Sequence, residues 1–336
     1  MTITAAMVKE LRELTGAGVM ACKNALVETD GNQEAAIEVL RKKGEATAVK
    51  KSGRIAAEGI VYTLVEDGKA AIVEVNSETD FVAKNEKFQT FVGNVAKQIV
   101  ASDAKDVEEL LGEAWILDPA KTVKDELVSQ IAVIGENMNI RRFEKLESEG
   151  VISSYIHAGG KIGVLVEADA PANDAVTAAI KTIAMQIAAM NPIAIDEAGV
   201  PESVKEAEIQ VAIDKTKKEQ VDKAVEAALK KAGINPAHVD SEEHMESNKA
   251  KGWITDEDIA KAKEIIATVS AEKSANLPEA MIQNIAKGRL GKFLKEVCLL
   301  NQEDIMDGKK TVREVLKEID PELQIVAFKR FTLRAE

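Results

Sequence analysis

Apolar residues recur at helical intervals through the first fifty residues and predict three short helices. The first has Thr4 as its N-cap, and a glycine-containing turn over residues 15–18 ends it. The second is predicted over Val19–Thr29 and the third from about Asn32, with Gly44 interrupting it. With the linker that follows, residues 1–54 form an N-terminal module too small to be more than marginally stable alone.

From Ile55 the apolar pattern becomes strand-like. Gly59–Val65 and Lys69–Val75 flank Glu66-Asp67-Gly68, and Asp-Gly suits the tight turns of β-hairpins. A polar corner over Asn76–Asn85 follows, and then a helical stripe with apolar positions at Phe88, Phe91, Val92, Val95 and Ile99. Further helices are predicted over Asp103–Gly112 and Thr122–Ile134, and a strand over Ile140–Leu146.

The same pattern returns in the second half of the chain. Glu58-Gly59-Ile60-Val61 is echoed by Glu149-Gly150-Val151-Ile152, and the motif Ala-x-Gln-Ile-x-Ala begins at both Ala96 and Ala184. Such units predict an α+β fold with two related subdomains, each an antiparallel sheet with helices on one face. The first subdomain is assigned to residues 55–148 and the second to residues 149–200 and 277–336.

Between the two parts of the second subdomain, residues 201–276 are charged and rich in alanine. Pro201–Lys231 fits one long helix, Gly233-Ile234-Asn235-Pro236 breaks it, and Thr255–Val269 returns as a helix. This predicts an inserted helical hairpin that projects from the core.

Composition narrows the functional classes. The 336 residues carry a formal net charge of −13, which argues against general nucleic-acid binding because phosphate contacts need a basic surface. Cys22 and Cys298 lie in apolar helical patterns without metal-binding spacing, so we expect reduced, buried thiols. With neither a signal-like start nor a bilayer-length apolar run, we expect a cytoplasmic protein that binds no membrane, cofactor or metal.

The corner itself carries the most distinctive chemistry. Ser77 or Thr79 can cap a helical turn, with Asp80 where the helix dipole favours a negative charge. Phe81 either projects from this corner or begins the buried stripe that continues at Phe88. Spacing alone favours the buried reading, because apolar residues at helical intervals are usually core. The second half has no matching Thr-Asp-Phe-Val, which favours a functional role for Asp80 and Phe81.

Four ordered segments resemble the bacterial translation elongation factor Ts family: Thr15–Leu26, Thr79-Asp80-Phe81-Val82-Ala83-Lys84-Asn85, Ile134–Arg142 and His157–Val166. The resemblance covers residues 1–200 and about 277–331; the 201–276 segment is longer than in shorter members, and the turn after His157 has one extra small residue. It implies that the N-terminal module is similar to a ubiquitin-associated three-helix bundle.

For function, the resemblance implies a guanine-nucleotide exchange factor that binds the GTPase elongation factor Tu in its GDP-bound and nucleotide-free forms, with a homodimer of the 1:1 complex. It assigns displacement of the partner's Mg²⁺ to Thr79, Asp80, Phe81 and Val82. Other partner contacts are assigned to Arg12, Met20, Ile134, Gly135 and His157. Met20 has an equally good alternative as a core residue.

Two other functional classes remain as alternatives. A protein-binding adaptor would use the three-helix module without changing nucleotide release. An enzyme would need a constellation that the sequence does not offer: the three histidines are scattered, and Gly159-Gly160-Lys161 lacks the spacing of a phosphate-binding loop. We therefore expect no catalytic residues.

Overall fold

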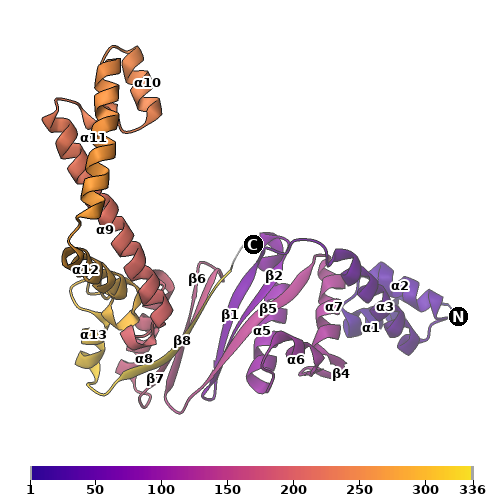
Figure 1. The fold of residues 1–336 in the computed structure, drawn as a ribbon. Coiled ribbons are helices and arrows are strands. Elements are labelled where there is room, and N and C mark those ends of the chain that lie inside the picture. Colours follow the sequence, from indigo (N-terminus) through magenta and orange to yellow (C-terminus); the bar gives the residue numbers. More distant parts are fainter. Residues whose placement is uncertain (1, 334–336) are drawn as a thin grey trace. The chain divides into compact units, whose positions relative to one another are not determined.

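The computed structural model describes residues 2–333 and divides into two compact units. One takes the chain up to Ile195 together with the part from Glu303 onward, and the other is Asp196–Gln302. The second unit thus includes residues 277–302, which the sequence analysis assigned to the second subdomain. Each unit is described separately below (Figure 1).

The N-terminal module of the first unit contains α1 (Ala5–Thr15), α2 (Val19–Glu28) and α3 (Gln33–Lys51). Thr4 Oγ1 accepts a hydrogen bond from the Met7 N–H (3.3 Å), and Gly16 ends α1 in the left-handed conformation (φ 67°). The small shared core is formed by Val8, Leu11, Cys22, Ala25, Leu26 and Ala36.

The prediction that Gly44 interrupts the third helix is wrong, because α3 runs through it to Lys51. Gly44 is buried against α7 (Val123–Ile134), and a Cβ placed on it would lie 3.6 Å from Ala132 Cβ and 3.7 Å from Val128 Cγ1. Its missing side chain lets the two helices approach closely, so glycine here serves packing between the module and the core.

The first subdomain is built on an antiparallel sheet of β1 (Glu58–Glu66), β2 (Lys69–Ser77) and β5 (Met138–Glu147), in the order β1-β2-β5. The β1–β2 turn has positive φ at both central residues, Asp67 (48°) and Gly68 (76°), as the Asp-Gly signal predicts. The remaining elements are α4 (Asp80–Ala83), α5 (Glu86–Ala101), α6 (Val107–Gly112), β3 (Ala114–Trp115), β4 (Asp118–Thr122) and α7.

The second subdomain repeats this plan with β6 (Val151–His157), β7 (Ile162–Asp169) and β8 (Gln324–Thr332) in the order β6-β7-β8. Its helices are α8 (Asp174–Met190), which packs on β6 and β7, and α13 (Val312–Ile319), which packs on α8. The two sheets face each other across a core of Val61, Ala70, Ile72, Leu146, Leu165 and Phe331, as their adjacent ribbons show (Figure 1). The predicted α+β class with two related sheets is confirmed.

The repeated glutamine of the Ala-x-Gln-Ile-x-Ala motif has the same task in both subdomains. The amide oxygen of Gln98 accepts from the Ile116 N–H (2.7 Å), and that of Gln186 accepts from the Ile305 N–H (2.8 Å). Each glutamine holds the start of a turn that leads through Asp-x-x-Lys-Thr-Val into a helix. The short β3–β4 hairpin that contains the first of these turns was not predicted from the sequence.

The second unit is helical, and its longest helix, α9 (Glu202–Lys231), matches the predicted Pro201–Lys231 closely. It packs against both α11 (Asp256–Ala275) and α12 (Glu279–Val297), and its C-terminal end shares a small core with α11 that includes Leu229, Val239 and Met245. The remaining elements are η1 (Glu197–Gly199), η2 (Pro236–His238), α10 (Glu242–Ala250) and η3 (Leu299–Asn301). Within residues 2–333, no helix combines the length and the apolar character needed to cross a bilayer.

Candidate functional site: the corner between β2 and α5

The corner forms because β2 ends at Ser77 and one turn of helix, α4, follows at once. Thr79 is the N-cap, with an extended backbone (φ −127°, ψ 154°), and its Oγ1 accepts from the Val82 N–H at 3.3 Å. The side chains of α4 differ in burial: Ala83 is buried, Val82 packs partly against the core, and Phe81 points away from the core.

Phe81 is 81% exposed, whereas Phe88, seven residues later, is fully buried. The aromatic ring therefore does not begin the buried stripe of α5, although the spacing alone favoured that reading. Large exposed aromatic side chains next to polar groups are typical of interaction sites. The geometry thus leaves the ring free to contact another molecule.

Asp80 lies beside Phe81 and is also exposed. Its carboxylate accepts a hydrogen bond from Lys84 Nζ at 2.7 Å, one turn further on. This hydrogen bond lowers the pKa of Asp80, so the carboxylate is ionised at neutral pH. The corner therefore presents a negative charge immediately before the exposed ring.

The loop after α7 lies directly against the corner, which brings Ile134 and Gly135 close to it. Gly135 ends α7 in the left-handed conformation (φ 86°), and the next residue, Glu136, accepts hydrogen bonds from both the N–H and the Oγ1–H of Thr79 (3.0 and 2.6 Å). In return, Glu78 accepts from the Asn137 N–H at 2.6 Å. No pattern in the sequence indicates a role for Glu78, Glu136 or Asn137.

His157 is exposed at the end of β6, where its Nδ1 lies 3.1 Å from Tyr155 Oη. The turn that follows contacts β1, because the Val61 N–H donates to Gly160 O at 2.7 Å. Since Ile60 on β1 pairs with Val75, two residues before β2 ends, the turn lies toward the corner's end of the sheet. A second potential contact surface is thus arranged near the first.

Arg12 and Met20 lie on the N-terminal module and not at the corner. Arg12 is exposed in the last turn of α1, and Met20 on α2 is 63% exposed, so Met20 does not belong to the module's core. The buried residues of α2 are instead Cys22, Ala25 and Leu26. Both predicted contact residues are accessible to a partner.

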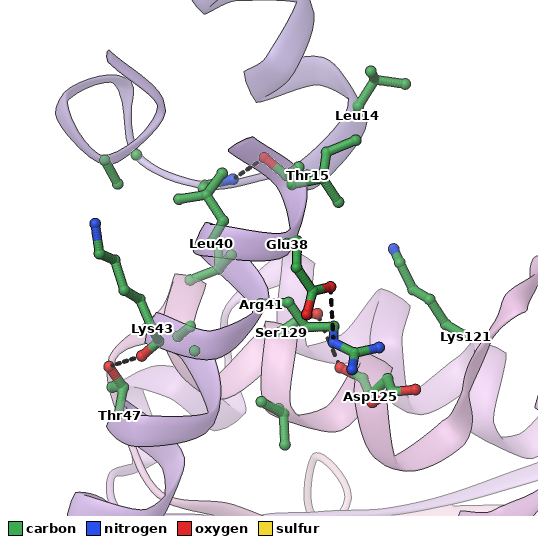
Figure 2. A pocket seen from close by; sticks show the side chains of 18 of the residues that line it. Leu14, Thr15, Glu38, Leu40, Arg41, Lys43, Thr47, Lys121, Asp125 and Ser129 are labelled. Carbon is green, nitrogen blue, oxygen red and sulfur yellow. Dashed lines mark hydrogen bonds and ion pairs between the residues drawn. The ribbon is translucent and has the colours of Figure 1, made fainter. Parts of the chain in front are cut away.

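A cavity of about 500 Å³ lies elsewhere, between the module and α7, and no corner residue is among the described residues that line it. Figure 2 shows Glu38 and Arg41 of α3 next to Asp125 of α7, with Leu14 and Thr15 at the end of α1. Arg41 already pairs with Glu38 (3.6 Å), and the Thr122 N–H, aided by the charges of Arg41 and Lys121, lowers the pKa of Asp125. Lys121 likewise pairs with Asp118 (3.3 Å), so these charged groups of the lining already have partners within the chain.

No group of three or more His, Cys, Asp or Glu side chains among residues 2–333 is arranged to hold a metal ion. His238 and His244 belong to the second unit, where His244 Nδ1 lies 2.5 Å from Asp240 Oδ1. His157 lies in the first unit with Tyr155 as its neighbour.

Protonation of Glu78 gives a testable pH dependence. The Asn137 N–H, and after it Arg54 and Lys51, lower the pKa of Glu78 below the ordinary 4.5. The unfolded chain therefore takes up this proton first, so the carboxylate's contribution to stability is complete above about pH 4.5 and is lost as pH falls through the lower native pKa. We expect the ¹³C chemical shift of the Glu78 carboxyl group to titrate with a midpoint below pH 4.5. The amide proton shift of Asn137, which donates to this carboxylate, should change over the same pH range. Titration at or above 4.5 contradicts this, and Glu78→Gln removes the step.

Known proteins are similar to this chain along its whole length. The family model described as elongation factor TS matches residues 78–335. The protein named elongation factor Ts of Phocaeicola vulgatus is 63% identical over the full length of both chains, and that of Parabacteroides distasonis is 59% identical over the full length of both. The one from Clostridium novyi is 42% identical over 98% of this chain and 92% of its own. The long 201–276 segment is therefore shared with the full-length matches.

Proposed function

The chain belongs to the elongation factor Ts family, and on that premise we propose that it is a cytoplasmic guanine-nucleotide exchange factor for the translational GTPase elongation factor Tu. It is not an enzyme in the sense of changing covalent bonds. It binds the GTPase, promotes release of GDP and leaves the GTPase free to take up GTP. The observation that carries the mechanism is the exposed ring of Phe81 on a capped corner.

Exchange by binding requires that the factor prefer the nucleotide-free GTPase. Linkage then lowers the affinity for nucleotide by the same factor, and a fall from nanomolar to micromolar corresponds to about 4 kcal/mol of coupling. Burying an aromatic side chain of this kind supplies about 2–3 kcal/mol. A single ring can therefore provide a large share of the coupling, and other contacts must provide the rest.

We assign the step to the corner as follows. Phe81 enters an apolar crevice of the GTPase and moves the elements that hold Mg²⁺ and the phosphates, with the Asp80 carboxylate beside it. Mg²⁺ bridges phosphate oxygens and neutralises their charge, so its displacement weakens nucleotide binding. Thr79 and Val82 act in the same step through the shape of the corner, since their side chains are engaged within the protein.

Other surfaces supply affinity. Arg12 and Met20 hold the nucleotide-binding domain of the GTPase, and Ile134, Gly135 and His157 form part of the contact surface on or beside the core. These residues are all at least partly exposed. The competing proposal, an adaptor that binds through the N-terminal module, shares the contacts of Arg12 and Met20 but leaves nucleotide release unchanged.

The test is stopped-flow release of a fluorescent GDP analogue from elongation factor Tu, with the chain at substoichiometric concentration. An exchange factor accelerates release and turns over, whereas an adaptor binds without changing the rate. The Mg²⁺ step is tested in the same assay with EDTA: if displacement of the metal is the mechanism, the acceleration shrinks once the metal is already removed. Full acceleration in EDTA would contradict that step.

A further inference from the structure

Three segments that are distant in sequence meet behind the corner. They are the linker after α3, the end of β2 and the loop after α7. Their interacting residues, which we call the corner clasp, are Lys51, Arg54, Glu78, Thr79, Glu136 and Asn137.

Two carboxylates connect the corner to the loop after α7 by hydrogen bonds. Glu136 accepts from the Thr79 N–H and Oγ1–H (3.0 and 2.6 Å), and Glu78 accepts from the Asn137 N–H (2.6 Å). Each carboxylate thus binds the backbone of the other's segment. Hydrogen bonds to an ionised acceptor are about twice as strong as neutral ones, so the two segments are held firmly together.

The linker joins the same clasp. Arg54 Nη1 lies 3.4 Å from Glu78 Oε2, and Arg54 O accepts from Asn137 Nδ2 at 2.7 Å. Lys51 Nζ at the end of α3 donates to Gly135 O. The end of the N-terminal module and the corner are therefore fixed to one loop.

Among residues 2–333, four other helices have a threonine N-cap; α1 has Met7 at the third position after Thr4, and the remaining three have an acid there and indicate the role of Glu136. At Thr122, Thr255 and Thr311, an acid three residues later accepts from both the N–H and the hydroxyl of the capping threonine, at 2.7–3.0 Å. This is the capping box. In α4 the third position is Val82, which has no acceptor, and Glu136 accepts from the same two donors although it is 57 residues away.

We propose that Glu136, supported by Glu78, is a positioning residue that completes the cap of α4 and so fixes the outward direction of Phe81. A single turn of helix is unstable by itself, because nucleation costs more than its few hydrogen bonds return. Phe81 makes little contact with its own chain, so its direction depends on the turn that carries it. This inference rests on the proposed exchange function, in which a ring already held in its bound direction associates at a smaller cost in entropy.

The first test needs no partner. In Glu136→Ala, hydrogen exchange of the amides of residues 79–83 should accelerate about tenfold or more, while Glu136→Gln, whose amide oxygen still accepts, should restore most of the protection. The matched control is Glu314→Ala, which removes the same two hydrogen bonds from Thr311 in the second subdomain. It should leave residues 79–83 unchanged. Unchanged exchange at 79–83 in Glu136→Ala overturns the positioning role.

The second test uses GDP release from elongation factor Tu. Glu136→Ala should raise the concentration of the chain needed for half-maximal acceleration by about tenfold, with a smaller change in the maximal rate, and Glu136→Gln should recover it. In a Phe81→Ala background, Glu136→Ala should have little further effect, because it acts through the ring. Additive losses overturn the proposal. If Phe81→Ala leaves release unchanged while the amides still open in Glu136→Ala, the ring's role in exchange fails and the clasp is supported.

Discussion

Replacing Phe81 by alanine is expected to slow stimulated GDP release by about 30- to 140-fold at limiting concentrations of the chain. The ring is 81% exposed, so its removal takes little from the core of this chain and acts on the complex. Loss of about 2–3 kcal/mol of apolar burial corresponds to a range of this size, at 1.4 kcal/mol per tenfold. Phe81→Leu should keep an intermediate rate because it keeps part of the apolar surface.

The control for this variant is Met306→Ala, which removes an exposed apolar side chain (72% exposed) from the second subdomain. Met306→Ala should stimulate GDP release from the GTPase at the same rate as the unsubstituted chain. Both variants should unfold within a few degrees of the original chain, since neither side chain is buried. A Phe81→Ala chain that stimulates release normally would refute the role of the ring, whereas a slow Met306→Ala chain would show that exposed apolar surface in general is needed.

Local signals in the sequence were sufficient for most of the fold. The Asp67-Gly68 turn, the glycine that ends α1 and the apolar stripe of α5 each depend on residues within a few positions of one another. The repeated motifs by themselves also indicate two related sheets. These elements follow from backbone preferences and periodicity, which act over one or two turns.

Gly44 and the β3–β4 hairpin show where local reasoning fails. A glycine within a helix normally weakens it, but the contact with Ala132 and Val128 of α7 is a tertiary cause that lies more than eighty positions away. The hairpin has Ile116 and Leu117 at its turn in place of the usual glycine or asparagine, so turn chemistry gave no signal. The buried Gln98 that holds it provides the reason for its shape.

At the candidate site, the sequence supplied the residues and the structure supplied their state. Spacing could not decide whether Phe81 is buried, because seven residues separate it from Phe88 in either case. The partners of Thr79 and Glu78 were also out of reach, since the hydrogen bonds from Thr79 to Glu136 and from Asn137 to Glu78 span 57 and 59 residues. One local sign was present: a capping threonine followed three positions later by Val82 lacks the usual acid.

Both halves of the repeat have a glycine at the same position, in Glu58-Gly59 and Glu149-Gly150, and at each position a side chain would overlap the neighbouring strand. A Cβ on Gly59 would lie 2.1 Å from Val75 O, and one on Gly150 would lie 2.2 Å from Ala168 O. In each sheet the middle strand changes register with its other neighbour at the same place, between Glu74 and Val75 and between Glu167 and Ala168. The two glycines therefore permit the same close approach of strands beside a bulge.

Gly59→Ala is consequently expected to lower the free energy of unfolding of the first unit by about 3 kcal/mol or more, from backbone strain and overlap together. Gly59 has φ +130°, and the new Cβ would also lie 2.7 Å from Asn76 Cα, so only backbone movement relieves it. Gly93→Ala is the matched control, because its Cβ would lie 3.7 Å from the Tyr62 ring and alanine favours the helix. Thermal unfolding followed by circular dichroism measures both, and a Gly59→Ala midpoint equal to that of Gly93→Ala would contradict the strain. Gly59 pairs with Asn76, where the corner begins, so Gly59→Ala should also impair stimulated GDP release at temperatures where the chain is folded. Gly150→Ala, with a comparable overlap in the other sheet, should lose stability alone.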